Sequence, residues 1–271
     1  MGRSFRAWRR LAASAGALSA LVVASPAAAQ DSEPEVIVSF GVGPQFLPTY
    51  PGSDEYQISP LFGGHVRREG EPISARAPDD GFGFSLTGRG GPIEVGPVLH
   101  FQGEREAADV GAAVGDVDFT FEPGAFVNVN VSDNFRLRAE ARRGIGGHEA
   151  WLGDLGADFF LRGGLDTLFS IGPRVKLADQ DYMQAYFGVT PAVAAAAGIP
   201  AFTPDGGIRA VGAIAGVTHQ ISRSFGVYAY AGYDRLVGDA ADSPIVTRFG
   251  SEDQFSGGIA LYFSFRMRNP F

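Results

Sequence analysis

The C-terminal stretch 254–265 alternates between apolar and polar positions. The apolar positions are Phe255, Gly257, Ile259, Leu261, Phe263 and Phe265, and those between them are Gln254, Ser256, Gly258, Ala260, Tyr262 and Ser264. Successive side chains of a strand point to opposite faces, so this strand has one apolar, aromatic face. In lipid all its backbone groups must pair, which strands achieve only in a closed barrel. The stretch therefore predicts the closing strand of a membrane β-barrel, marked by Gly257, Gly258, Leu261, Phe263 and Phe265.

Similar alternation recurs along the chain and divides it into twelve expected strands. They cover about 36–46, 58–66, 72–77, 82–86, 93–102, 119–131, 135–142, 158–166, 171–177, 207–220, 224–237 and 254–265. The links at 68–71, 89–91, 132–133, 169–170 and 221–223 are short, and most links between them are long. In outer-membrane barrels the long loops face outward and the short turns face the periplasm. We therefore predict an all-β, transmembrane, antiparallel up-and-down β-barrel of twelve strands, or of ten if residues 72–89 are irregular.

The N-terminus has the three parts of a secretory signal peptide. Four arginines within residues 3–10 precede the apolar run 11–24, and Ala27, Ala28 and Ala29 form a small-residue cleavage site. The apolar run is short and interrupted by serine and glycine, which disfavours a membrane anchor. We predict a signal peptide at 1–29 and a single barrel domain at 30–271, exported to the outer membrane of a Gram-negative cell.

Charge and cysteine content exclude several classes of function. The predicted signal peptide holds four of the 22 basic residues and none of the 30 acidic ones, so the mature chain carries 18 basic and 30 acidic residues, a formal charge of −12. Such a chain repels nucleic acid, which is not an expected partner. The chain has no cysteine, which excludes thiol catalysis, disulfides and cysteine metal sites.

Charged residues gather on the expected lumen face of four consecutive strands. They are Glu122, Arg136, Arg138, Glu140, Arg142, Asp158, Arg162, Asp166, Arg174 and Lys176. Mixed charges at this density predict ion pairs that fill the barrel interior. The alternative is a narrow charged conduit, because charged residues at membrane depth commonly line paths, and its basic excess would favour anions.

Recognisable catalytic motifs are missing from the sequence. His148 has no second histidine at metal-ligand spacing, and neither a nucleophile elbow nor a zinc-protease motif is present. The glycine-rich pieces starting at Gly81, Gly88 and Gly144 precede no expected helix, so they predict turns rather than phosphate loops. We predict no catalytic, cofactor or metal site and no enzymatic activity.

Three loop stretches resemble the MipA/OmpV family of outer-membrane proteins. They are 50–56, 186–190 and 235–246, in the same order as in the family, and the last is the most specific. The resemblance implies an outer-membrane barrel that serves as a scaffold between a membrane-bound lytic transglycosylase and a bifunctional penicillin-binding protein in murein synthesis. Other members resemble antigens or permeability and adaptation factors. The chain departs from the family in extending beyond Phe265 and in having residues 197–200 in place of a Ser-Gly pair.

The family-like loop residues have two interpretations. These residues are Tyr50, Pro51, Gly52, Ser53, Asp54, Asp239, Asp242, Ser243 and Pro244. Proline and glycine fix tight turns, and Asp and Ser side chains cap backbone donors, so the residues predict a rigid set of loops. The alternative is an external ligand, or a cation held by Asp54, Asp239 and Asp242.

The order of expected functions follows from the resemblance and the expected lumen. A murein-enzyme scaffold comes first, a narrow channel or permeability factor second, and an outer-membrane enzyme third. Murein enzymes work in the periplasm, so we expect their contact surface on the short-turn rim: residues 67–71, Arg89, Asp133, Arg223 and the tail 266–271. The small area of this rim predicts a weak or lipid-assisted contact, and outer-membrane lipid is the other expected partner.

Overall fold

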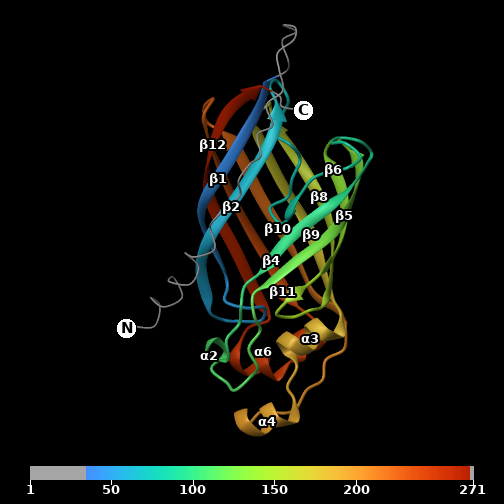
Figure 1. Cartoon of the computed structure of the whole chain (residues 1–271), viewed down its shortest axis with the longest axis vertical. Coiled ribbons are helices and arrows are strands. Elements are labelled where there is room, and N and C mark those ends of the chain that lie inside the picture. The colour runs from blue at the N-terminus through green and yellow to red at the C-terminus, as the bar shows by residue number, and fades with distance from the viewer. Residues whose placement is uncertain (1–34, 269–271) are drawn as a thin grey trace, which may run out of the picture. The chain divides into compact units, whose positions relative to one another are not determined.

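The structure is a computed structural model that describes residues 35–268 (Figure 1). The predicted signal peptide at 1–29 and the end of the predicted tail, 269–271, lie outside the described residues and stay predictions. Within the described chain, no helix is long and apolar enough to cross a membrane.

A single antiparallel sheet of twelve strands curls around the long axis of the molecule (Figure 1). The strands are β1 (Glu35–Pro48), β2 (Tyr56–Arg68), β3 (Phe82–Gly83), β4 (Ile93–Gln102), β5 (Thr120–Ser132), β6 (Phe135–Arg143), β7 (Ile145–Gly146), β8 (Trp151–Gly163), β9 (Thr167–Ala178), β10 (Gly207–Gln220), β11 (Phe225–Leu236) and β12 (Asp253–Arg268). Their order in the sheet is β2, β1, β12, β11, β10, β9, β8, β6, β5, β4, β3, with β7 beside β5. The predicted all-β antiparallel fold is confirmed.

The last strand pairs with the first, as the sequence predicts for a closing strand. In the register of β1 with β12, Val38 lies opposite Phe265 and Val42 opposite Leu261. On the lumen side, the hydroxyls of Ser39 and Ser264 are 2.8 Å apart. Strand β12 therefore joins the two ends of the described chain in one continuous ladder.

Three boundaries differ from the sequence prediction. Residues 72–77, expected as a strand, form none, and residues 72–81 turn into the lumen instead. The turn expected at 169–170 lies at 164–166, between β8 and β9. The predicted 144–153 loop contains β7 and the start of β8. Two of the twelve strands, β3 and β7, have only two residues each.

The outer face of the sheet is a belt of large apolar side chains. Every long strand contributes to it, and examples are Phe40, Phe62, Phe101, Phe121, Phe159, Phe169, Phe225 and Phe263. An exposed apolar surface this extensive indicates contact with lipid. On β12, Leu261 is 68% exposed and Phe263 50%, whereas Ser264 is only 3% exposed. The alternation along the closing strand therefore separates a lipid face from a lumen face.

Five short helices gather at one end of the sheet (Figure 1). They are α2 (Ala107–Val110), α3 (Gln180–Phe187), α4 (Pro191–Ala197), α5 (Asp239–Asp242) and α6 (Pro244–Phe249). All lie in the long links that follow β4, β9 and β11. The short turns lie at the opposite end, so the predicted separation of long loops from short turns holds in the described chain.

Candidate functional site

Residues 72–81, called here the inward segment, enter the lumen after the turn that follows β2. The backbone N–H of Ile73 donates to the carbonyl oxygen of Leu165 at 3.2 Å, and Arg162 donates to the carbonyl oxygen of Ile73. The Ile73 side chain is buried against Phe160 and Leu168. These contacts anchor the segment to β8 and β9, which explains why its side chains do not face lipid as a strand would.

The tip of the inward segment carries two carboxylates that bind lumen arginines. Arg136 makes a bidentate contact with Asp80, with both N–O distances 2.8 Å. Arg174 likewise contacts both oxygens of Asp79 at 2.6 and 2.8 Å. Asp158 lies between the two arginines, 2.5 Å from Arg136 and 2.7 Å from Arg174. Bidentate guanidinium–carboxylate contacts are directional, so they fix the tip in one position.

A second cluster of ion pairs lies beside the first. Arg142 contacts Glu122 at 3.0 Å, Glu140 at 2.5 Å and Asp154 at 2.7 Å. Arg138 is 2.6 Å from Glu140, and its guanidinium packs over the Phe126 ring at 4.3 Å. Two histidines complete the cluster: His100 is 2.8 Å from Glu140, and His148 is 3.0 Å from Glu122. Buried charges are stable only when they are paired in this way.

Most of the sequence-predicted lumen residues belong to these clusters. Those in the clusters are Glu122, Arg136, Arg138, Glu140, Arg142, Asp158 and Arg174. Lys176 pairs separately with Asp234 at 2.5 Å. Arg162 instead binds the backbone of the inward segment, and Asp166 lies in the β8–β9 turn, 3.7 Å from Arg67.

Four acidic partners were missed at the sequence level. Asp79 and Asp80 lie between the expected strands 72–77 and 82–86, Asp154 lies between 135–142 and 158–166, and Asp234 lies on the expected strand 224–237. No local signal marks Asp79 and Asp80, because Asp-Gly after proline is typical of an ordinary hairpin turn. These four carboxylates offset the basic excess of the predicted lumen, so the reason to expect anion preference is lost.

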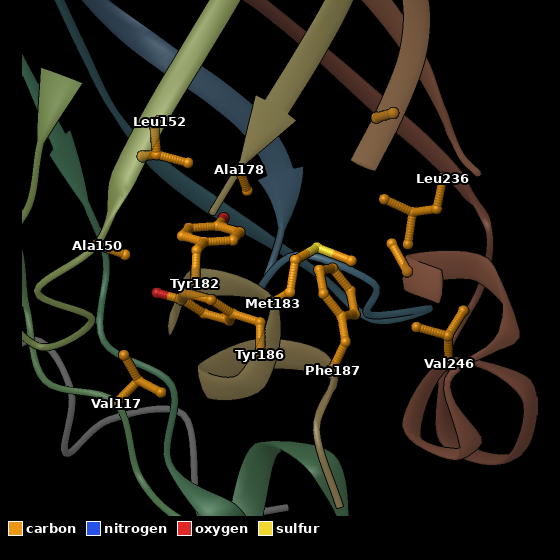
Figure 2. Packing of buried hydrophobic residues seen from close by; sticks show 12 residues of the cluster. Val117, Ala150, Leu152, Ala178, Tyr182, Met183, Tyr186, Phe187, Leu236 and Val246 are labelled. Carbon is orange, nitrogen blue, oxygen red and sulfur yellow. The ribbon is translucent and has the colours of Figure 1, made fainter. Parts of the chain in front are cut away.

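The end of the lumen beneath the long loops is covered by α3 (Figure 2). Tyr182, Met183, Tyr186 and Phe187 are fully buried and pack against residues of β8, β9, β11 and α6: Leu152, Ala178, Leu236 and Val246. Asp179 caps the helix, because its carboxylate accepts from the backbone N–H of Tyr182 at 3.0 Å. This helix and the loops around it are called here the cap.

Burial in the cap changes the acidity of its tyrosines. Desolvation raises the pKa of Tyr182 and that of Tyr186 above the ordinary value of 10.0. Neither hydroxyl has a hydrogen-bond partner among the described residues. Arg105 packs over the Tyr186 ring at 5.4 Å and donates to the Tyr186 carbonyl oxygen at 3.1 Å. Burial therefore keeps both tyrosines neutral at neutral pH.

The family-like loop residues hold the cap together. The Ser243 hydroxyl donates to the carbonyl oxygen of Phe187 at 2.7 Å, and the backbone N–H of Gly52 donates to Gln254 at 3.0 Å. Gly52 has φ +96°, and a Cβ there would lie 2.9 Å from the Val246 side chain. Asp239 accepts from the backbone N–H of Asp205 at 2.7 Å. These contacts agree with a rigid set of loops.

The remaining motif residues are distributed between the interior and the surface of the loops. Tyr50, Ser53 and Pro244 are buried, Pro51 is half-buried, and Asp54 and Asp242 are exposed. No group of three or more metal-binding side chains occurs among residues 35–268. Asp54, Asp239 and Asp242 therefore do not come together as the cation alternative requires.

Two lumen cavities flank the tip of the inward segment. One, of about 180 Å³, is lined by Asp79, Arg174, Lys176 and Tyr230, among others. The other, of about 160 Å³, lies on the side of β2 and β3. Both are lined by Pro78 and Leu61, so the segment tip separates them.

The apolar belt, the filled lumen and the cap define the class of protein: a membrane β-barrel whose interior is occupied by its own side chains and by an inward segment. The family profile described as MltA-interacting protein MipA matches residues 40–265. The chain therefore belongs to the MipA family, as the resemblance of its loops implies. Family membership and the lipid-facing belt together support an outer-membrane barrel protein.

Comparison with solved structures gives only distant similarities. An outer-membrane channel from Pseudomonas putida F1 is 12% identical with TM-score 0.40, covering 90% of this chain and 100% of that one. Outer-membrane expressed OmpT of Vibrio cholerae is 10% identical with TM-score 0.37, covering 87% and 99%. The N-terminal β-barrel domain of Pseudomonas aeruginosa OprF is 13% identical with TM-score 0.25, covering 64% and 96%. None of the curated proteins matches this chain.

Proposed function

We propose that this barrel is a non-catalytic, non-conducting scaffold for murein-synthesis enzymes. The observation that carries the proposal is the filled lumen: the ion pairs of Arg136, Arg142 and Arg174 and the inward segment occupy its centre. The cap covers the loop end above them. The family description, MltA-interacting protein, supplies the class of partner.

The contact surface of such a scaffold is the rim at the short-turn end. Arg68, Arg89, Asp133 and Arg223 are exposed there, and Arg266 forms an exposed ion pair with Glu69 at 2.7 Å. The expectation that Arg67 also belongs to this surface is wrong. Its side chain is buried and donates to the carbonyl oxygen of Glu71 at 2.6 Å. The rim therefore offers Arg68, Arg89 and Arg223 as its accessible cations.

The test combines capture of partners with a conductance measurement. The mature barrel should capture a lytic transglycosylase and a bifunctional penicillin-binding protein, and Arg68→Gln with Arg89→Gln and Arg223→Gln should abolish capture. Arg248→Gln on α6 removes the same charge at the opposite end and should leave capture intact. Planar bilayers should record no steady current. Capture that survives the triple variant but is lost with the 239–253 loop would contradict the proposed rim.

A narrow channel is the second candidate, and the two cavities beside the inward segment favour it. Displacement of the segment tip would join them. Under this alternative, Asp79→Asn with Asp80→Asn weakens the contacts that hold the tip and turns a silent barrel into a conducting one. If this variant folds and stays silent in planar bilayers, the channel alternative is excluded.

A further inference from the structure

Strands β2 and β3 form the two ends of the described sheet. β2 pairs with β1 along its whole length, and β3 pairs only with β4, so no backbone ladder joins β2 to β3 among the described residues. A side-chain contact crosses the seam, from Arg89 to the carbonyl oxygen of Val66 at 2.5 Å. Unpaired strand edges are unfavourable in lipid, so an opening here calls for something that occupies it.

The cavity of about 160 Å³ lies at this seam. Its walls include Phe62 and Gly64 of β2 on one side and Gly81 and Phe82 on the other. Phe62 is 53% exposed and Phe82 54% exposed, both within the lipid-facing belt. The cavity is therefore lined by two residues of the lipid-facing belt and also by buried interior residues such as Asp80 and Leu168.

The inner end of the cavity is polar and basic. Arg76 lines it and donates to the carbonyl oxygens of Asp80 and Gly81, at 3.1 and 2.5 Å, but no described carboxylate lies within ion-pair distance of its guanidinium. The carboxylate of Asp80 is already bound by Arg136. His65 also lines the cavity, and its Nε2 is buried without a hydrogen-bond partner in the described chain.

Further positive charge surrounds this end. Arg67 and Arg89 lie close enough to the His65 ring, together with Arg76, for their charges to act on it. A half-buried guanidinium without a counter-ion is unfavourable, and an anion that reached it would gain charge-assisted hydrogen bonds. The cavity thus brings a guanidinium that has no described carboxylate within 4.0 Å together with the apolar residues Phe62 and Phe82.

We propose that this cavity binds a single-chain anionic lipid of the fatty-acid type. The carboxylate contacts Arg76 and His65, and the acyl chain passes between Phe62 and Phe82 into the membrane. The volume admits a carboxylate and a few methylenes, since one water occupies about 30 Å³ of liquid. The rest of the acyl chain lies outside the cavity, in the membrane. This site is tested separately from the scaffold proposal: Arg89 lies near both, but Arg76, which the test changes, is not one of the rim residues.

A second copy of the chain is the competing occupant of the seam. A strand edge of the second copy would pair with the unpaired backbone N–H and C=O groups of β2, but it would bring no anion to Arg76. The charge at the inner end therefore favours the fatty acid.

The experiment uses the mature barrel refolded in detergent and dibromostearate as the probe. Phe84→Trp places a fluorophore on the lipid face beside the seam, and Trp151→Phe removes the tryptophan of the described chain. Bromine quenches tryptophan on contact, so dibromostearate should quench saturably. Its methyl ester, which lacks the charge, should bind at least about tenfold more weakly, as expected for the loss of a charge-assisted hydrogen bond.

Arg76→Gln should weaken dibromostearate binding by a similar factor, and Arg76→Lys should restore part of it. Arg248→Gln is the matched control and should bind like the parent. Equal quenching by dibromostearate and its methyl ester overturns the proposal. This comparison does not depend on any substitution of Arg76. Unchanged binding by a folded Arg76→Gln barrel also overturns it. A stable dimer in light scattering without fatty acid overturns it as well, since a second copy then occupies the seam.

Discussion

The lumen wall has two halves that differ in how they fill space. The charged half, formed by β5, β6, β8 and β9, fills the interior with the ion pairs around Arg136 and Arg142. The tyrosine half, formed by β1, β2, β11 and β12, presents mainly glycine, serine and tyrosine, and its inward tyrosines include Tyr228, Tyr230 and Tyr262. A Cβ at Gly41 or Gly63 would lie 2.7 or 2.5 Å from Tyr262, so glycine makes room for the ring. Both cavities border the tyrosine half.

Both paired charges and large aromatic rings can fill the interior of the barrel. They differ in how much space they leave for a ligand. In an ion-pair cluster, directional contacts hold each side chain in one position, and every charged group is already paired. A ring opposite glycine fills only the volume in front of that glycine, and space remains beside it. The rigid part of the lumen is therefore the charged half, and the part able to accept a ligand is the tyrosine half.

The largest expected effect comes from breaking a buried pair in the charged half. Arg136→Met leaves Asp80 and Asp158 buried without their shared partner and should lower the free energy of unfolding by about 3–5 kcal/mol. Denaturant unfolding of the refolded barrel measures the loss. Arg235→Met is the control, because its pairs with Glu252 and Asp253 are exposed and should contribute little to the free energy of unfolding. Equal losses would show that the lumen pairs are solvated.

The closing strand of the tyrosine half should be sensitive on one face only. Leu261→Arg places a charge in the lipid-facing belt and should cost about 2–4 kcal/mol near the bilayer midplane. Ser264→Ala, on the lumen face, removes its contact with Ser39 and should cost only about 1 kcal/mol. Heat-modifiable gel mobility and denaturant unfolding in lipid vesicles report both. Comparable losses at the two positions would contradict the register of β12.

A smaller effect is expected where glycine faces the ring. Gly63→Ala places a methyl group 2.5 Å from the Tyr262 hydroxyl and should cost about 1–3 kcal/mol through overpacking. In a Tyr262→Phe background the nearest ring carbon is 3.4 Å away, so most of the cost should disappear. A double-mutant cycle on unfolding free energies measures this coupling. A cycle with no coupling would mean that the two positions do not touch.

The smallest effect lies in the cap, which contacts both halves through its loops. Because the pKa of Tyr182 and that of Tyr186 are raised, the neutral hydroxyls stabilise the folded cap at pH below 10.0. That stability should be lost as the pH rises above the unfolded value toward the folded ones. Limited proteolysis of the loops should therefore accelerate above pH 10 while the barrel still migrates as folded. Tyr182→Phe with Tyr186→Phe should remove this alkaline transition. If the double variant still shows faster proteolysis above pH 10, other titrating groups cause the transition.

The alternation of side chains was enough to predict the strands and their faces, as on β12. Local patterns failed for residues 72–81, because Asp79 and Asp80 are held by Arg174 and Arg136, which are 95 and 56 positions away. Such contacts depend on how the sheet curls in three dimensions and leave no periodic signal. The lumen charges were predictable because they lie on regular strands, whereas Asp154 was missed since the β8 boundary was misplaced. The roles of the charged residues in function remain proposals.

The ladder between β1 and β12 sets the order in which the barrel can assemble. Ser39 and Ser264 are 225 positions apart, so β1 cannot pair with β12 until nearly the whole chain has been synthesised. Contacts between distant parts of a chain make folding slow. Until then the β1–β2 hairpin has two unpaired strand edges. The unpaired strand edges therefore need protection until β12 can pair with β1. A truncation before residue 254 would leave an aggregation-prone sheet rather than a smaller barrel.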